Sequence, residues 1–275
     1  MTIPHRQLLM EANSRELVAV AFSPREAHSM VCSTIALSPD TPSPLRRLED
    51  AVYDHDFLLA EYRRTVMLYD SPRVAALPYS PDERVVMDMF RTLYPASEPG
   101  TEALVSLLPE LNMSLCSEIP SDVRHFICRT FPGVTLEHPL APLCRYFRAR
   151  HPQRRKGKTL VNIRGNRLDI ITLGQEAPML VTSHYIETAM DAVYYILASR
   201  EALRLPDTDE ILIAGDRMLR AEITPVLRRY VRYVMPAIFP SVMFQAGKAS
   251  LSAPFELVVA PLVAAAANPV IHSSL

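Results

Sequence analysis

The densest cluster of possible binding residues is a basic segment near the middle of the chain, Arg145 to Lys158. Two aromatic residues, Tyr146 and Phe147, lie among its arginines and lysines. Basic side chains neutralise phosphates and aromatic rings stack on bases, so the segment is a candidate site for RNA or another polyanion. The formal net charge of -1 favours the other interpretation, a solvated connector whose aromatic residues pack inward. The candidate polyanion contacts are Arg154, Arg155, Lys156 and Lys158.

A second arginine cluster lies on and just before a predicted helix. If both clusters share one face of the protein, nucleic-acid binding gains support. The members of this second cluster are Arg217, Arg220, Arg228, Arg229 and Arg232.

Residues that often catalyse reactions or bind metals are present but lack the required spacing. No histidine stands in an H-x-x-x-H pair, and the four cysteines form no C-x-x-C pair. The serines lack the G-x-S-x-G pattern of hydrolases. Asp54, His55 and Asp56 form a possible acid/base group, but successive residues of a helix point in different directions. We therefore predict no metal site and no catalytic residue.

Glycine is scarce in this chain. It has 7 glycines, where average usage of about 7% would give roughly 19. Phosphate-binding loops need glycine because the backbone must approach the phosphate closely. The glycines form neither a P-loop nor the Rossmann fingerprint, which excludes both of these nucleotide-binding motifs.

Length and composition indicate a globular protein of two domains. The 275 residues are 49% hydrophobic and 21% charged, which is ordinary for a chain that buries a sizeable core. The longest apolar run, Leu257 to Ala267, contains Pro261 and is too short to span a membrane. No secretory signal is recognisable, and the cysteines lack a disulfide pattern. We expect a cytoplasmic protein that does not contact membranes.

The last part of the chain has the clearest pattern of elements. A β-hairpin is predicted from Lys158–Ile163 and Leu168–Leu173, around a turn at Arg164 to Arg167. The other predicted elements are a strand at 178–183, a helix at 187–200, a strand at 210–214, a helix at 219–234, a strand at Val242 and Phe244, and an apolar helix at 254–267 that packs on this lobe.

The first part of the chain predicts a looser version of the same order. Its first two strands are expected at Leu17–Phe22 and Ala27–Leu37, with a turn at Ser23 to Arg25. A hairpin that leads into a parallel sheet with helices on its faces is an α/β arrangement. The elements predicted next are a helix at 45–60, strands at 65–69 and 73–77, a helix from residue 81, strands at 103–108 and 113–116, a helix at 121–131, a strand at 134–137 and a helix at 142–150.

This order of elements resembles the actin-like ATPase fold, also called ribonuclease-H-like. The stretch from Lys158 to Phe244 further resembles an uncharacterised bacterial family, domain of unknown function 3822, which has that fold. The resemblance implies an α/β protein of two actin-like lobes, each a mixed sheet with helices, which we assign to residues 1–150 and 151–275. The segments that carry it are Val161-Asn-Ile-Arg-Gly-Asn-Arg-Leu-Asp-Ile170, Asp191-Ala-Val-Tyr-Tyr-Ile196 and Ile211-Leu-Ile-Ala-Gly-Asp216.

The resemblance also implies a nucleotide site between the lobes. Active members of the superfamily read approximately D-I-G-G-G-T-T-D-I in the second-lobe hairpin. Here Asn162 replaces the metal-positioning acid, Gly165 is the one turn glycine kept, and Asp169 is the last acid. The turn that meets the adenosine in active members keeps Gly215 and ends at Asp216.

The corresponding loop of the first lobe is less clearly marked. It falls near Ser23 to Arg25, or just ahead of the first predicted strands at Glu11 to Ser14. Neither candidate contains glycine.

Three functions are compatible with these residues. An amide at Asn162 adds no charge to hold Mg²⁺, and side chains in the turn crowd a phosphate. The leading hypothesis is therefore a non-catalytic, degenerate scaffold that needs no cofactor and binds a protein partner. An RNA-associated protein would instead use the basic segment. A divergent ATPase, hydrolysing ATP with Mg²⁺, would use Asn162, Gly165, Asp169, Gly215 and Asp216.

Overall fold

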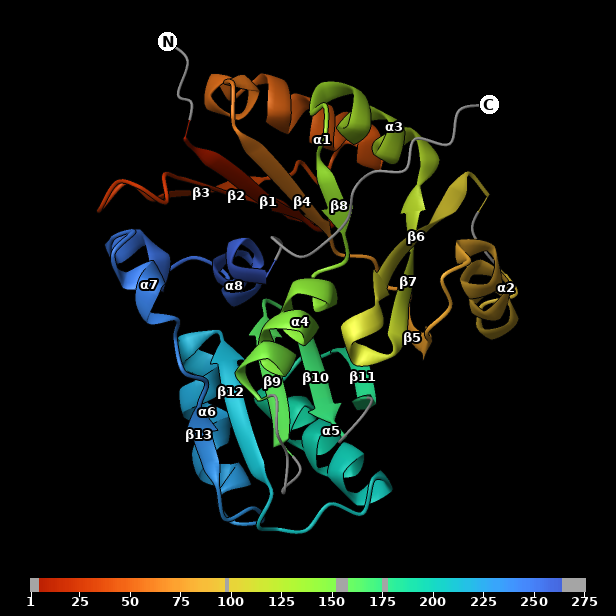
Figure 1. The fold of residues 1–275 in the computed structure, drawn as a ribbon, viewed down its shortest axis with the longest axis vertical. Helices are drawn as coiled ribbons and strands as arrows, with labels where there is room; N and C mark the ends of the chain where they lie inside the picture. Colours follow the sequence, from red (N-terminus) through yellow and green to blue (C-terminus); the bar gives the residue numbers. More distant parts are fainter. Residues whose placement is uncertain (1–4, 97–98, 152–157, 175–177, 264–275) are drawn as a thin grey trace.

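The computed structural model describes residues 5–96, 99–151, 158–174 and 178–263. Two five-stranded sheets with their helices form two lobes, one above the other in Figure 1, and a three-stranded sheet lies beside them. The two larger sheets repeat one plan, because each has three antiparallel strands followed by two parallel ones.

The sheet of the first lobe has the order β3-β2-β1-β4-β8. Helices α1 (Pro44–Tyr53) and α3 (Ser121–Thr130) bury one of its faces. Ser43 caps α1 by accepting a hydrogen bond from the Arg46 backbone N–H, and proline follows at the first helical position. The strands are β1 (Gln7–Ala12), β2 (Glu16–Phe22), β3 (Val31–Ala36), β4 (Arg64–Tyr69) and β8 (Thr135–Glu137).

The sheet of the second lobe has the order β11-β10-β9-β12-β13. Its central strand β9 therefore corresponds to β1 of the first lobe. Helices α5 (Ala189–Ala202) and α6 (Arg217–Leu227) bury one face, while α4 (Leu140–Arg150) packs on the other. The strands are β9 (Lys158–Arg164), β10 (Arg167–Leu173), β11 (Pro178–Tyr185), β12 (Glu210–Gly215) and β13 (Val234–Pro236).

The three-stranded sheet is inserted between β4 and α3, in the order β5-β7-β6. Its small core joins Leu77, Val86, Phe90 and Cys116. The inserted elements are β5 (Val74–Pro78), α2 (Glu83–Leu93), β6 (Thr101–Leu108), a 3-10 turn (Pro109–Leu111) and β7 (Met113–Pro120).

Helix α8 (Phe255–Val263) lies between the two lobes (Figure 1). Leu257, Val258 and Ala260 pack against the first sheet, in a core that also includes Leu9 and Leu68. Phe255 and Val259 belong to the core that covers the second sheet and α4. Of the apolar helix predicted at 254–267, residues 255–263 form α8 and 264–267 lie outside the described residues; α8 contacts both lobes and not the second alone.

The structure also corrects several predicted elements. The first strand, β1 at Gln7–Ala12, was not predicted, and the segment expected to be first is β2. The sequence of β1, QLLMEA, consists of good helix formers, and its strand pattern is hidden because both faces are buried.

Two predictions near the end of the chain are wrong. The expected strand at Val242 and Phe244 is part of a short helix, α7 (Ser241–Phe244). The helix expected to reach residue 234 ends at Leu227, and β13 supplies the fifth strand. A strand of three residues at a sheet edge is too short to show an alternating pattern.

Candidate functional site

A cleft of about 1060 Å³ lies between the two lobes. The carboxyl ends of four parallel strands open into it, at Ala12 (β1), Tyr69 (β4), Arg164 (β9) and Gly215 (β12). Ligands of open α/β sheets bind outside the carboxyl ends of the strands. This cleft is therefore the candidate site.

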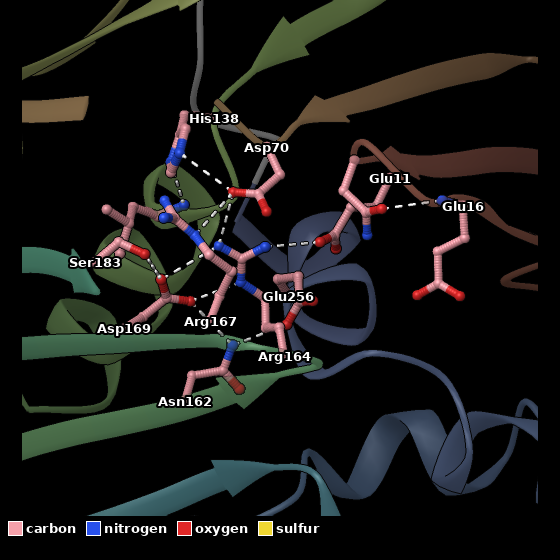
Figure 2. Close-up of polar contacts among 12 residues, drawn as sticks. Glu11, Glu16, Asp70, His138, Asn162, Arg164, Arg167, Asp169, Ser183 and Glu256 are labelled. Carbon is pink, nitrogen blue, oxygen red and sulfur yellow. Dashed lines mark hydrogen bonds and ion pairs between the residues drawn. The ribbon is translucent and has the colours of Figure 1, made fainter. Parts of the chain in front are cut away.

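Arg164 places its guanidinium group among carboxylates from both lobes (Figure 2). Its nitrogens lie 2.9 Å from Glu11 Oε1 and 3.1 Å from Asp70 Oδ1, which belong to the first lobe. They also lie 2.7 and 3.2 Å from the two carboxylate oxygens of Asp169 in β10. The arginine side chain is only 6% exposed. It thus joins the two lobes through buried ion pairs.

The pKa values of Arg164 and Asp169 are shifted by burial and by the charges of their neighbours. Burial alone would lower the pKa of Arg164, but the carboxylates of Asp169, Asp70 and Glu11 raise it well above its usual value. Burial alone would raise the pKa of Asp169, but Arg164 and the Ser183 hydroxyl lower it. Ser183 Oγ donates a 2.7 Å hydrogen bond to Asp169 Oδ1. Arg164 and Asp169 therefore form a charged pair at neutral pH.

Arg167 and His138 extend this network around Asp70. Arg167 Nε lies 3.6 Å from Asp70 Oδ1, and its guanidinium stacks 4.5 Å from the ring centre of Tyr185. His138 Nδ1 accepts a hydrogen bond from the Leu140 backbone N–H, which leaves Nε2 as the donor toward Asp70 and the Ser71 carbonyl. Burial lowers the pKa of His138 to about 4, so the ring is neutral.

Glu11 and Glu256 bring two buried carboxyl groups together at the inner end of the cleft. Burial and the negative charge of Glu256 raise the pKa of Glu11 well above its usual value, against the opposite effect of Arg164. Asn162 Nδ2 donates to Glu256 Oε2 at 2.9 Å and to Asp169 Oδ2 at 3.4 Å. The amide thus links the α8 carboxylate to the second-lobe acid without adding charge.

Gly165 forms the β9–β10 turn with Asn166. Its φ of +52° lies in the left-handed region, and a Cβ atom there would contact nothing within 4 Å. The glycine therefore serves the backbone conformation of a two-residue hairpin turn. Both residues of the turn line the cleft.

Gly215 has a different reason to be glycine. A Cβ atom at this position would lie 2.0 Å from the Ile163 backbone oxygen, and φ is +84°. The next residue, Asp216, donates its N–H to that same oxygen at 2.9 Å. Its carboxylate accepts a 2.8 Å hydrogen bond from the Leu219 N–H and caps α6. Backbone packing and helix capping account for both residues.

The family of the chain follows from its sequence. The profile of the family described as "Protein of unknown function (DUF3822)" matches residues 2–234. The chain belongs to this family. A search of curated protein sequences found no match.

Solved structures give the fold. A Bacteroides thetaiotaomicron VPI-5482 protein, described as having an actin-like ATPase fold and unknown function, superposes with a TM-score of 0.73 at 16% identity, over 85% of this chain and 91% of that chain. A structure described as the PilM-PilN type IV pilus biogenesis complex gives 0.52 at 13% identity, over 98% and 100%. The two-lobed actin-like fold predicted from the sequence is confirmed.

Within this fold, the structure places the predicted nucleotide residues in the ion network or on the lining of the interlobe cleft. Asn162 and Asp169 belong to the ion network, and Gly165, Gly215 and Asp216 line the cleft. Of the two first-lobe loops considered, Glu11 to Ser14 lines the cleft, whereas Ser23 to Arg25 is not among its lining residues. That these residues bind a nucleotide stays a prediction.

Sequence reasoning missed much of the network. In the comparison with active members, Arg164 stands where a turn glycine is expected, and its charge predicts no partner by itself. The sequence does not single out four other members of the network: Asp70, His138, Arg167 and Glu256. For Asp70, Arg167 and Glu256, the partner is 94 or more residues away in the chain. His138 meets Asp70 only through the packing of the elements. One signal is present in the sequence, because Glu11 and Arg164, residues of opposite charge, lie in the two segments that the resemblance places at corresponding loops of the two lobes.

The basic segment divides into a buried beginning and a part that the structure does not describe. Tyr146 and Phe147 are buried, as the connector interpretation expects, and Arg145 pairs with Glu137 at 2.6 Å. Arg154, Arg155 and Lys156 lie outside the described residues, and Lys158 pairs with Glu210 at 2.7 Å. RNA binding by these four residues stays a prediction.

The acid/base group considered at residues 54–56 does not assemble. Asp54 ends α1, His55 Nδ1 bonds to the Ala51 carbonyl, and Asp56 starts a 3-10 turn (Asp56–Leu59). Among the described residues, no group of three or more His, Cys, Asp or Glu side chains could hold a metal ion. No helix in the described ranges is long and apolar enough to cross a membrane.

Proposed function

We propose that this protein is a non-catalytic member of the actin-like fold that recognises a protein partner. The observation that carries the proposal is the placement of Arg164, whose guanidinium group is bound by Glu11, Asp70 and Asp169 between the lobes. In this proposal the guanidinium group of Arg164 holds the lobes together, so no nucleotide is needed between them.

The residues of the cleft do not fit Mg²⁺ and ATP. Mg²⁺ prefers carboxylate and phosphate oxygens. Here Asp169, Glu11 and Asp70 already bind Arg164, and Glu256 accepts a hydrogen bond from the Asn162 amide. Phosphoryl transfer depends on positioned metal and backbone groups. The first-lobe turn between β1 and β2, residues 13–15, contains no glycine that would let a phosphate approach its backbone.

A protein partner is supported by the fold's likeness to PilM. That protein was solved in a complex named for PilM and PilN, and it matches this chain over nearly its whole length. The same fold therefore forms part of a protein complex in PilM, and we propose a role of that kind for this chain.

Thermal denaturation with excess ATP and Mg²⁺ tests the proposal. A ligand at about 100 times its Kd would stabilise the native state by roughly 2.7 kcal/mol. We expect the unfolding midpoint to stay the same as with Mg²⁺ alone. A rise of several degrees that disappears when Gly165 is replaced by valine would contradict the proposal and favour a divergent ATPase.

A further inference from the structure

The charges along the interlobe cleft are divided by depth. At the buried end, Arg164 and Arg167 lie among the carboxyl groups of Glu11, Asp70, Asp169 and Glu256, so acidic groups outnumber basic ones there. Toward the surface the balance reverses, because four arginines line the cleft with only two acids, Glu16 and Asp216. The four arginines are Arg15, Arg47, Arg217 and Arg220.

Three of these outer arginines lack an acidic partner. Arg15 lies in the turn between β1 and β2, and Arg217 and Arg220 lie in the first turn of α6. Within the described ranges none of the three forms an ion pair. Arg47 is already occupied, since it donates to the backbone carbonyls of Thr41 and Ser14. Both walls of the cleft therefore present free guanidinium groups.

The acids near these arginines do not neutralise them. Asp216 is committed to the cap of α6, where its carboxylate accepts the Leu219 N–H at 2.8 Å. Glu16 remains as one carboxylate opposite three free arginines. The outer cleft thus attracts anions, and guanidinium forks fit carboxylates well.

Apolar side chains line the same cleft as the arginines. Leu251, which is 61% exposed, lines it together with Phe239, Pro254 and Phe255. A ligand with both carboxylates and apolar groups matches this surface. A compact phosphate ligand matches it less well, because it has no apolar groups to cover Leu251 and Phe239.

We infer that the outer cleft binds an acidic segment of a protein partner, which carries apolar side chains among its carboxylates. The inference rests on the proposed function, a partner-binding role for the cleft. Carboxylates of the segment contact Arg15 on the first lobe and Arg217 and Arg220 on the second, while its apolar side chains cover Leu251 and Phe239. The segment therefore bridges the lobes at the surface, outside the Arg164 ion pairs.

A peptide of alternating glutamate and leucine, labelled with fluorescein, provides the probe. Its binding to the full chain is measured by fluorescence anisotropy at low salt, beside a lysine–leucine peptide of the same length. We expect the acidic peptide to bind and the basic peptide not to bind. Equal binding of both peptides, or no binding of the acidic one, would overturn the inference.

Matched variants locate the binding. Arg217→Gln with Arg220→Gln should weaken binding of the acidic peptide at least tenfold, and Arg15→Gln should weaken it several-fold. The control, Arg84→Gln with Arg129→Gln, removes the same charge from exposed arginines of α2 and α3 outside the cleft, and should change affinity less than twofold. Urea midpoints equal to wild type show that the variants are folded. Equal losses in both double variants would refute the site.

Two further titrations separate the possible failures. An oligouridylate that binds more tightly than the acidic peptide, and is lost in the same cleft variant, would assign the arginines to RNA and overturn the inference. Mg²⁺ and ATP are titrated into the same proteins. Absence of binding by both ATP and the peptide overturns only this inference, whereas ATP binding in the cleft overturns the proposed function.

Discussion

At the scale of single residues, the cleft is organised by Arg164. This residue stands where active members of the superfamily have a turn glycine, and here it is a buried cation that pairs with carboxylates from both lobes. A buried ion pair contributes little net stability compared with an apolar core, but removing one partner leaves uncompensated buried charge. The network is therefore sensitive to the loss of any single member.

Replacing Arg164 with alanine should destabilise the protein by about 3–5 kcal/mol, because Asp169 and Asp70 lose their main cation. Urea unfolding measures the change. Arg164→Lys keeps the charge but not the two-pronged geometry, so its cost should be smaller. As a control, Arg84→Ala at an exposed position should stay within about 0.5 kcal/mol of wild type. A loss under 1 kcal/mol for Arg164→Ala would mean that water already reaches the cluster.

His138 should make the protein less stable in mild acid. Its pKa is lowered to about 4 in the folded state, so the unfolded chain binds more protons between pH 6.5 and 4. Stability then falls as the pH drops through that range, by on the order of 3 kcal/mol from this residue. His138→Asn should flatten this part of the curve in urea titrations at successive pH values. An unchanged slope would argue against a neutral buried ring.

Glu11 should act in the opposite direction. Because its folded pKa is raised, the native state holds a proton that the unfolded chain releases above its ordinary pKa of about 4.3. Its contribution to stability is therefore full at low pH and decreases as the pH rises. Glu11→Gln removes this dependence, so the variant should gain stability relative to wild type as the pH is raised from 5 to 8. A difference between the two proteins that does not change with pH would contradict the shared burial of Glu11 and Glu256.

At the scale of elements, the β9–β10 turn and the end of β12 both reach the cleft, and each requires a glycine for a different reason. Gly165 requires only a left-handed backbone, whereas Gly215 also requires space beside Ile163. These two requirements explain why glycine stands at both positions in a chain that has so few glycines.

Gly215→Ala should therefore cost roughly 3 kcal/mol or more, since a Cβ atom would lie 2.0 Å from a backbone oxygen at a positive φ. Gly165→Ala meets no atom and should cost only about 1 kcal/mol for its left-handed backbone. Thermal unfolding of both variants gives the comparison. Similar costs would show that the β9–β12 contact can relax.

The elements of the second lobe could be predicted because their patterns are local. The β9–β10 hairpin is marked by two apolar runs on either side of the Gly165-Asn166 turn, and β12 is a short apolar run that ends at Gly215. β1 and β13 could not be predicted, because the sequence of β1, QLLMEA, consists of helix formers and β13 has only three residues. The ion network could not be predicted either, since its members meet only through the packing of two lobes and α8.

At the scale of the whole molecule, α8 and the Arg164 cluster join the two lobes by different means. Helix α8 contributes apolar side chains to one core on each lobe, and Glu256 adds a hydrogen bond from Asn162. Arg164 contributes charge across the cleft. Together they join the lobes at the inner end of the cleft.

A double-mutant cycle on Arg164 and Asp70 measures whether Arg164 couples the two lobes. Arg164→Gln and Asp70→Asn are made singly and together, and their free energies of unfolding are measured in urea. We predict a coupling energy of about 1 kcal/mol or more, because the two side chains contact each other across the cleft at 3.1 Å. Additive effects, with a coupling within about 0.3 kcal/mol of zero, would contradict the account.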